Sequence, residues 1–140
     1  MLRDIKKFTS RAKTERAVKL AVEAGMKVAC SIIIGHPTDT RDTIRDTIEF
    51  AAELRKLAKY ENQVRTDFSV ATPLPGTDLY VQAELLGLKI HHTRWHKYNF
   101  ITPVMDTPNL SAAEIRNLYY EAALSKMNEQ APWKEDRHVG

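Results

Sequence analysis

The stretch from Lys27 to Pro37, K-V-A-C-S-I-I-I-G-H-P, decides the fold of this chain. Apolar side chains fill every position but one from Val28 to Ile34, and Gly35 and Pro37 end the run. A run without alternation between apolar and polar residues is typical of a strand covered on both faces, as in a parallel sheet. The sequence therefore predicts a buried parallel strand at residues 27–34, followed by a tight turn.

Helical patterns flank this strand on both sides. Thr14 can cap a helix that runs through Ala24, and Gly25 would end that helix in a left-handed conformation. After the turn, apolar residues recur at helical spacing to about Ala58, and Thr38, Asp39 or Thr40 can cap this longer helix. The local order is therefore helix, strand, turn and helix.

A second strand is predicted from about Thr66 to Thr72. It ends at Pro73-Leu74-Pro75-Gly76, where the prolines lack backbone donors and the glycine permits a left-handed turn. Residues 35–65 are enough for a crossover helix, so the two strands form a parallel βαβ unit with a right-handed crossover. Both strands then end at the same edge of the sheet, where parallel α/β folds bind their ligands.

The remainder of the chain has a weaker pattern. Thr77 or Asp78 can cap a short helix that ends at Gly87. Residues 88–109 are irregular and rich in aromatic and histidine side chains, with room for one short strand. Ser111 and Glu114 form a capping box that opens a last helix to about residue 127.

The composition is that of one globular domain. The chain has 140 residues, of which 43% are apolar and 28% charged, and its net charge of +3 is spread along the sequence without a basic run that would indicate nucleic acid. No apolar stretch approaches the ~18 residues of a membrane span, and residues 1–8 have no signal-peptide core, so we expect a cytoplasmic protein without membrane partners. Cys30 is the only cysteine, and within the apolar strand it is most simply a small buried hydrophobe.

Two stretches also resemble a known family: AVKLAVEAGMKVACSIIIGHPTDTRDTIRDTIEFAAEL (17–54) and DFSVATPLPGTDLYVQAELLGL (67–88). They are similar to the C-terminal part of the catalytic barrel of radical S-adenosylmethionine (radical SAM) enzymes. The branch is the one that often carries a cobalamin-binding domain and includes anaerobic magnesium-protoporphyrin IX monomethyl ester cyclases. The spacing of the I-I-G-x-P and T-P-x-P-G-T turns carries most of this resemblance.

The resemblance implies an α/β fold, the end of a partial (βα)6 barrel with parallel strands, crossover helices and a C-terminal helix. Residues 1–90 would form the last βα units, and residues 91–140 an irregular aromatic segment with a helix packed on them. In the family, the penultimate strand passes the adenine of S-adenosylmethionine and the last strand's exit closes that end. By resemblance these positions are Ile33, Ile34 and Gly35, and Thr72, Pro73 and Leu74.

The family's cluster motif, C-x3-C-x2-C, is absent from this chain. We therefore expect a fragment of an iron–sulfur enzyme, cyclase- or methyltransferase-like, that is inactive alone because the ligands of its [4Fe–4S] cluster are missing. The parent enzyme would use S-adenosylmethionine and that cluster as cofactors. The resemblance does not decide whether the parent also uses cobalamin. The binding partner of this chain would be the rest of the parent polypeptide. Two alternatives remain: a self-standing α/β binding or interaction module, and a small non-radical enzyme that uses His36 and Asp39.

Single residues at the strand exits have two interpretations each. Gly35 either lets backbone approach an adenine or is required by the turn, and the two roles are compatible. His36 is a weak catalytic candidate, because it leaves the strand at the ligand edge, although an incidental loop histidine fits the pattern as well. Asp39 is interpreted mainly as a helix cap, with a site carboxylate as the alternative.

The segment after residue 88 offers weaker candidates. His92 and His96 have a spacing of four, but no helical pattern enforces it and no acidic or cysteine partner lies nearby, so no metal site is expected there or at His91. Trp95, Tyr98 and Phe100 most simply cover the end of the core, although in a larger parent they could line a substrate cavity.

Two parallel strands alone leave both edges of the sheet open. Such a small sheet is marginal in water. We therefore expect the chain either to pair these edges with another copy or to recruit residues 88–104 as additional strands.

Overall fold

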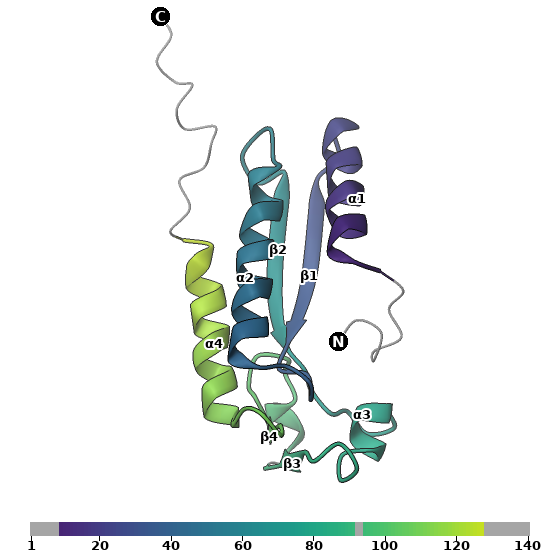
Figure 1. The fold of residues 1–140 in the computed structure, drawn as a ribbon, viewed down its shortest axis with the longest axis vertical. Coiled ribbons are helices and arrows are strands. Elements are labelled where there is room, and N and C mark those ends of the chain that lie inside the picture. The colour runs from purple at the N-terminus through teal and green to yellow at the C-terminus, as the bar shows by residue number, and fades with distance from the viewer. Residues whose placement is uncertain (1–8, 92–93, 128–140) are drawn as a thin grey trace, which may run out of the picture.

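The computed structural model describes residues 9–91 and 94–127. Its elements are listed here in chain order and labelled in Figure 1: α1 (Arg11–Glu23), β1 (Val28–Ile34), α2 (Arg41–Lys56), β2 (Val64–Val70), α3 (Asp78–Val81), β3 (Lys89–Ile90), η1 (Trp95–Lys97), β4 (Met105–Asp106) and α4 (Ala112–Ser125). The long elements match the predicted helices and strands in type and order.

The centre of the fold is the parallel pair of β1 and β2. The register runs from Val28 opposite Val64 to Ile34 opposite Val70, and α2 is the crossover between the strands. This confirms the predicted βαβ unit, although the second strand lies two residues earlier than expected. Both strands end at the same edge, which is the lower end of the sheet in Figure 1.

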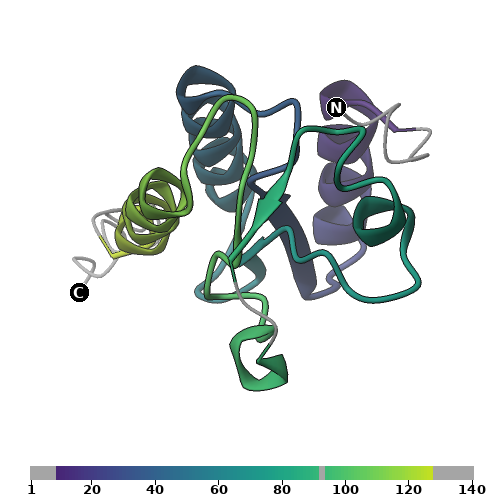
Figure 2. The same cartoon turned by 90° about the horizontal axis from the view of Figure 1, so that it is seen from below.

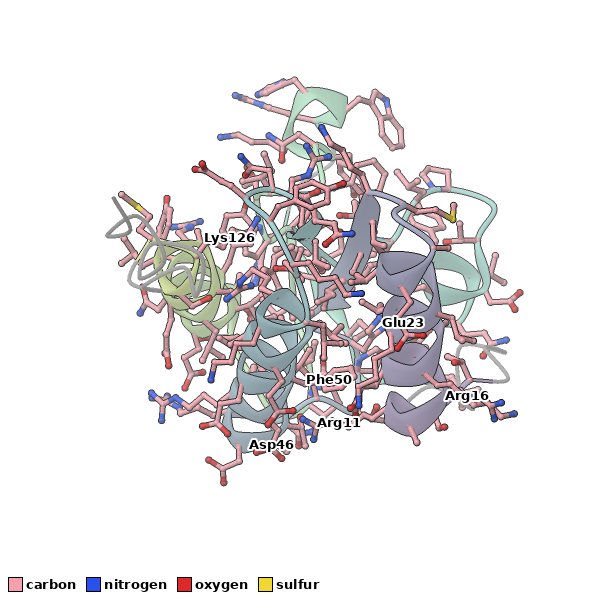
Figure 3. All side chains as sticks on the ribbon, turned by 90° about the horizontal axis from the view of Figure 1, so that it is seen from above. Arg11, Arg16, Glu23, Asp46, Phe50 and Lys126 are labelled. Carbon is pink, nitrogen blue, oxygen red and sulfur yellow. The ribbon has the colours of Figure 1, made fainter. Side chains whose placement is uncertain are left out.

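The three long helices lie on one side of this sheet. Helices α1 and α2 cover β1 and β2, and α4 packs beside α2 against β2 (Figure 1). The larger core cluster joins α2, α4 and both strands, and the side chains of Ile34, Ile44 and Ile115 in it are buried. A second cluster lies between α1, α2 and the starts of the strands, where Arg11 stacks over Phe50 with 4.5 Å from its Cζ to the ring centroid (Figure 3).

The opposite face of the sheet is open, which corrects the prediction that the first strand is covered on both faces. Burial alternates along β1, and Ala29, Ser31 and Ile33 are exposed while their neighbours face the helices. The apolar run misled the interpretation because Ile33 is apolar yet 39% exposed. Among the described residues, no element packs as a second layer of helices on this face.

The helix caps agree with the predictions in part. Ser10, not Thr14, caps α1, and its hydroxyl accepts a hydrogen bond from the backbone of Lys13 at 3.3 Å. Thr40 caps α2 in a reciprocal box with Thr43, so the main interpretation of Asp39 as the helix cap is wrong. The left-handed stop after α1 and the capping box that opens α4 are confirmed.

The segment between β2 and α4 holds more structure than expected. The predicted short helix is a single turn, α3, followed by turns to Gly87, and β3 and β4 form an antiparallel pair of their own. The prediction that residues 88–104 extend the main sheet is therefore wrong. The segment at residues 88–104 still contacts the end of β2 through its backbone, because Val70 N donates a hydrogen bond to Phe100 O at 2.7 Å. Within the described ranges, no helix is long and apolar enough to cross a membrane.

Candidate functional site

The exit of β1 is a buried turn that needs glycine. Gly35 has φ +81°, and a Cβ built on it would lie 3.0 Å from Cγ2 of Ile115 in α4. An L side chain would therefore be strained by the backbone conformation and would also collide with the core. The turn interpretation of Gly35 thus has a direct structural reason, and an adenine contact is not needed to explain the residue.

The side chain of Asp39 stabilises this turn through hydrogen bonds to its backbone. Its Oδ2 accepts hydrogen bonds from the backbone N–H groups of Gly35 and His36, both at 2.9 Å, and the residue is only 3% exposed. Burial raises the pKa of this carboxyl, while the backbone hydrogen bond from His36 opposes the shift. The sequence pattern missed this role because an aspartate before a helix resembles a cap, whereas here its acceptors serve the preceding turn.

The same turn is tied to the segment before α4. The side-chain amide of Asn109 donates to the backbone carbonyl of Asp39 at 3.1 Å, and the Asp39 N–H donates to the carbonyl of His36 at 2.9 Å. His36 itself is 8% exposed, so its imidazole is largely enclosed. The carboxylate of Asp39 is engaged by backbone, which gives no support to a non-radical enzyme that uses it as a base.

The exit of β2 lies directly beside that of β1. Ala71 N donates to Ile34 O at 2.8 Å, which extends the parallel pairing by one step, and the Thr72 hydroxyl donates to Val70 O at 3.0 Å. Pro73 is buried and Leu74 is half-buried. Residues 33–35 and 72–74, which were predicted to contact the cofactor, are therefore brought to one edge of the sheet.

Their side chains do not all face the same way. Ile34 is 1% exposed and belongs to the core between α2 and α4, so its side chain serves packing. Ile33 points to the open face and is 39% exposed. Of this pair, only Ile33 presents a side chain to a ligand at the open face.

The open face is small and polar along most of its length. From β1 it has Ala29, Ser31 and Ile33, which lie opposite Arg65, Asp67 and Ser69 of β2. Arg65 and Asp67 form an ion pair (Nε to Oδ2, 2.9 Å), and Lys126 approaches the other oxygen of Asp67 at 3.3 Å. These residues belong to no recognisable motif, although their alternation along β2 is visible in the sequence.

Cys30 is on the other face of β1. It packs partly buried against the cluster of α1 and α2, and burial raises the pKa of its thiol. A thiol held in its neutral form among apolar side chains is a poor metal ligand or nucleophile. Its predicted role as a small hydrophobe is consistent with this place.

The histidines after β3 do not converge. His91 pairs with Asp106 at 2.8 Å (Nε2 to Oδ2), His96 is in η1, and His92 lies outside the described residues. In the described part of the chain, no three histidine, cysteine or acidic side chains are placed to hold a metal ion.

The aromatic segment does not cover the core, which corrects that prediction. Trp95 is 63% exposed and Phe100 is 47% exposed, while Tyr98 is half-buried beside Trp95 with ring centroids 5.2 Å apart. Figures 2 and 3 both show η1 on the side of the sheet away from α1 and α2. The 3-10 turn that carries Trp95 therefore lies on the same side as the open face.

Comparison with known proteins identifies related sequences, although no protein-family model matches the chain. The chain is 35% identical over 109 residues to an uncharacterized methyltransferase of Pyrococcus horikoshii, and 37% identical over 103 residues to a Methanocaldococcus jannaschii protein with a provisional methylthiotransferase name. It is 26% identical over 137 residues to the anaerobic magnesium-protoporphyrin IX monomethyl ester cyclase of Rubrivivax gelatinosus. These matches cover 78%, 69% and 95% of the chain, respectively.

The chain is related to the radical SAM superfamily. The paired turns at 33–37 and 72–77 are the sequence features that carried this resemblance, and both lie at the shared strand edge. The chain spans only about a fifth of the length of these relatives: 22%, 21% and 23%. Their activities are therefore properties of much longer proteins.

Proposed function

We propose that this radical SAM relative forms the last two βα units of a partial (βα)6 barrel in a methyltransferase- or cyclase-like enzyme. The observation that carries the proposal is the one-sided sheet. In barrels of this type, helices cover the outer face of each strand while the inner face lines the interior. In the described residues, β1 and β2 are covered by helices on one face, open on the other, and each is paired along one edge only.

The open face then becomes the interior wall of the barrel. Small side chains along β1, Ala29 and Ser31, leave room inside. The ion pair of Arg65 and Asp67 lies in the first half and the middle of β2, before the strand reaches the ligand edge. Ile33 is the last side chain of β1 on the open face, next to the buried turn at Gly35. This arrangement provides one apolar side chain, that of Ile33, and backbone polar groups at the end where ligands bind in parallel α/β folds.

The residues present fit one part of the implied cofactors. Ile33, Gly35 and the segment 72–74 would hold the adenine side of S-adenosylmethionine, which supplies the 5′-deoxyadenosyl radical when bound beside a reduced cluster. Iron–sulfur clusters require several thiolates, and Cys30 is the chain's single cysteine and faces the helices. We therefore assign the [4Fe–4S] cluster to other parts of the parent and expect this chain alone to be inactive.

Segment exchange tests the proposal. The region of the Pyrococcus horikoshii relative that matches this chain would be replaced by the chain's own matching residues. Cluster assembly and the cleavage assay would be carried out anaerobically, with dithionite as the electron donor. We expect the chimera to cleave S-adenosylmethionine to 5′-deoxyadenosine at a rate within about tenfold of that relative, because the proposal assigns the same wall and strand exits to the matching residues of both chains. The Ile33→Asp chimera should lose most of this activity, because a charge replaces the apolar contact.

The matched control is Leu20→Asp, which places the same charge at an exposed aliphatic position of α1, away from the open face. It should retain cleavage. The proposal would be overturned if the chimera folds and binds as much iron as the relative but cleaves no S-adenosylmethionine. That result would favour a self-standing binding module. Iron content and circular dichroism, measured on every variant, separate a failed assembly from a failed active site.

A further inference from the structure

The two outer edges of the β1–β2 sheet are not equivalent. Backbone N–H and C=O groups alternate between the two sides of a strand. Val28 N and Ile34 O bond to β2, so the backbone groups of Ala29, Ser31 and Ile33 face the outer edge of β1. No hydrogen bond from the described residues reaches these outward groups, and β1 contains no charged side chain. The edge of β1 is therefore available to a further strand.

The edge of β2 is already paired at its carboxyl end. Ala71 N bonds to β1, so the even-numbered residues of β2 present their backbone groups to the outer edge. Of these, Val70 N donates to Phe100 O at 2.7 Å, and Val70 O accepts from the Thr72 hydroxyl at 3.0 Å. A strand that approached this edge from outside would have to displace both contacts.

The middle of the β2 edge is crossed by Lys126, which follows the last residue of α4 on the covered side of the sheet. Its Nζ lies 3.3 Å from Oδ1 of Asp67, whose side chain is on the open face. The same Nζ lies 5.8 Å from the ring centroid of Phe68, which belongs to the core on the covered face. A side chain that contacts both faces of a sheet passes around its edge, and β1 occupies the other side of β2. Lys126 therefore crosses the outer edge of β2, the side on which Figure 1 shows α4.

A lysine at a strand edge opposes the addition of another strand, because pairing would take its charge out of water. Lys126 is held at this edge by Asp67, whose other carboxylate oxygen pairs with Arg65 at 2.9 Å. The edge of β1 carries no comparable charge, since its outward positions are Ala29, Ser31 and Ile33. The sheet therefore has one edge that is open to pairing and one that is closed.

We propose that the chain accepts a further strand at the edge of β1 only, and that Lys126 closes the edge of β2. The strand that occupies the β1 edge belongs to the rest of the parent polypeptide, which makes up about four fifths of the length of the relatives. This choice of occupant rests on the proposed function. The closure of the β2 edge rests on the contacts of Lys126 alone, and it makes β2 the last strand of its sheet.

The test uses the isolated chain, in which other copies supply the probe strand. With one open edge per copy, association stops at two chains, whereas two open edges let each copy bind the next without limit. Lys126→Leu removes the charge at the β2 edge, so light scattering should show masses above two chains where the wild type stops at two. Lys19→Leu makes the same change at an exposed position of α1 and should behave as the wild type.

A double variant and amide hydrogen exchange assign the contact to its edge. Lys126→Leu combined with Ile33→Lys should stay at the mass of one chain, because every contact in a growing assembly uses a β1 edge. In the wild type, association should slow exchange of the Ala29, Ser31 and Ile33 N–H groups by roughly tenfold and leave those of Thr66 and Phe68 unchanged.

Three results would overturn the proposal: a wild type that stays monomeric at every concentration, a Lys126→Leu variant that matches Lys19→Leu, or a double variant that still associates. Circular dichroism on each variant shows that it is folded. Because no cluster or S-adenosylmethionine takes part, these outcomes are independent of the segment exchange described above.

Discussion

At the scale of single residues, the turn after β1 is fixed by backbone conformation, hydrogen bonding and side-chain packing together. Gly35 supplies the left-handed conformation, Asp39 accepts hydrogen bonds from the buried N–H groups of Gly35 and His36, and Ile115 packs against Gly35. The glycine and the proline of this turn were visible in the sequence. The aspartate's real role was not, because its partners are defined by the folded path of the backbone.

A matched pair of glycine substitutions tests the packing at this turn. Gly35→Ala introduces both left-handed strain and a Cβ at 3.0 Å from Ile115, so we expect a loss of about 2–4 kcal/mol in the free energy of unfolding. Gly76→Ala has the same strain, at φ +84°, but no atom within 4 Å of its Cβ, and should lose only about 1 kcal/mol. Urea denaturation followed by circular dichroism gives both values, and equal losses would show that Ile115 moves away without cost.

At the scale of elements, hydrogen bonds of one side chain connect the β3–β4 pair to the start of α4. Asp106 accepts from Ala112 N at 2.7 Å through Oδ1 and from His91 at 2.8 Å through Oδ2. The hydrogen bond from the Ala112 backbone, followed by that from His91, lowers the pKa of this carboxyl below its ordinary value of 3.8. One side chain therefore joins the ribbon to the helix that also packs on Gly35.

The hydrogen bonds of Asp106 contribute to the free energy of unfolding in a way that depends on pH, with a definite sign. Because the pKa of Asp106 is lower in the folded chain than in the unfolded chain, its ionised form stabilises the fold above pH 3.8, and the contribution is lost as the pH falls below that value. Asp106→Asn should therefore lower the unfolding free energy at pH 6 more than at pH 3. Asp46→Asn, on the exposed face of α2, should show no such trend, and a pH-independent effect of Asp106→Asn would contradict the assignment.

Element boundaries were predictable where local chemistry decides them. The Ser111–Glu114 box and the glycine stops are short-range signals, so α4 and the end of α1 were expected where they occur. The start of α1 was misplaced because Ser10 and Thr14 are equally good caps in sequence. The extent of α3 and the antiparallel ribbon depended on contacts across the fold, which no local pattern contains.

At the scale of the whole molecule, the sheet is unfinished within the described residues. Its two strands are covered by helices on one side only, and the ribbon of β3 and β4 does not join it. An exposed strand edge is a template for pairing with another chain. Of the two outcomes expected from the sequence, recruitment of residues 88–104 is wrong, and pairing with another copy stays a prediction.

Size-exclusion chromatography with light scattering tests this pairing. We expect a mass above that of one chain that rises with concentration, because the edge of β1 binds its equivalent in a second copy. Ile33→Lys places a charge on the exposed position of β1 and should return the protein to the monomer mass. Leu124→Lys alters an exposed position of α4, at 56% exposure, and should leave the mass unchanged. A monomer at all concentrations would contradict the prediction.

The sequence by itself determined the order of elements, the parallel direction of the two strands and the common edge at which they end. Connectivity and short-range signals suffice for these, because a crossover helix between two strands leaves them parallel. The tertiary structure alone decided which face of the sheet is covered, which way Ile33 and Ile34 point, and that Asp39 serves the turn. These depend on where α1, α2 and α4 pack, and that is settled by contacts between residues far apart in the chain.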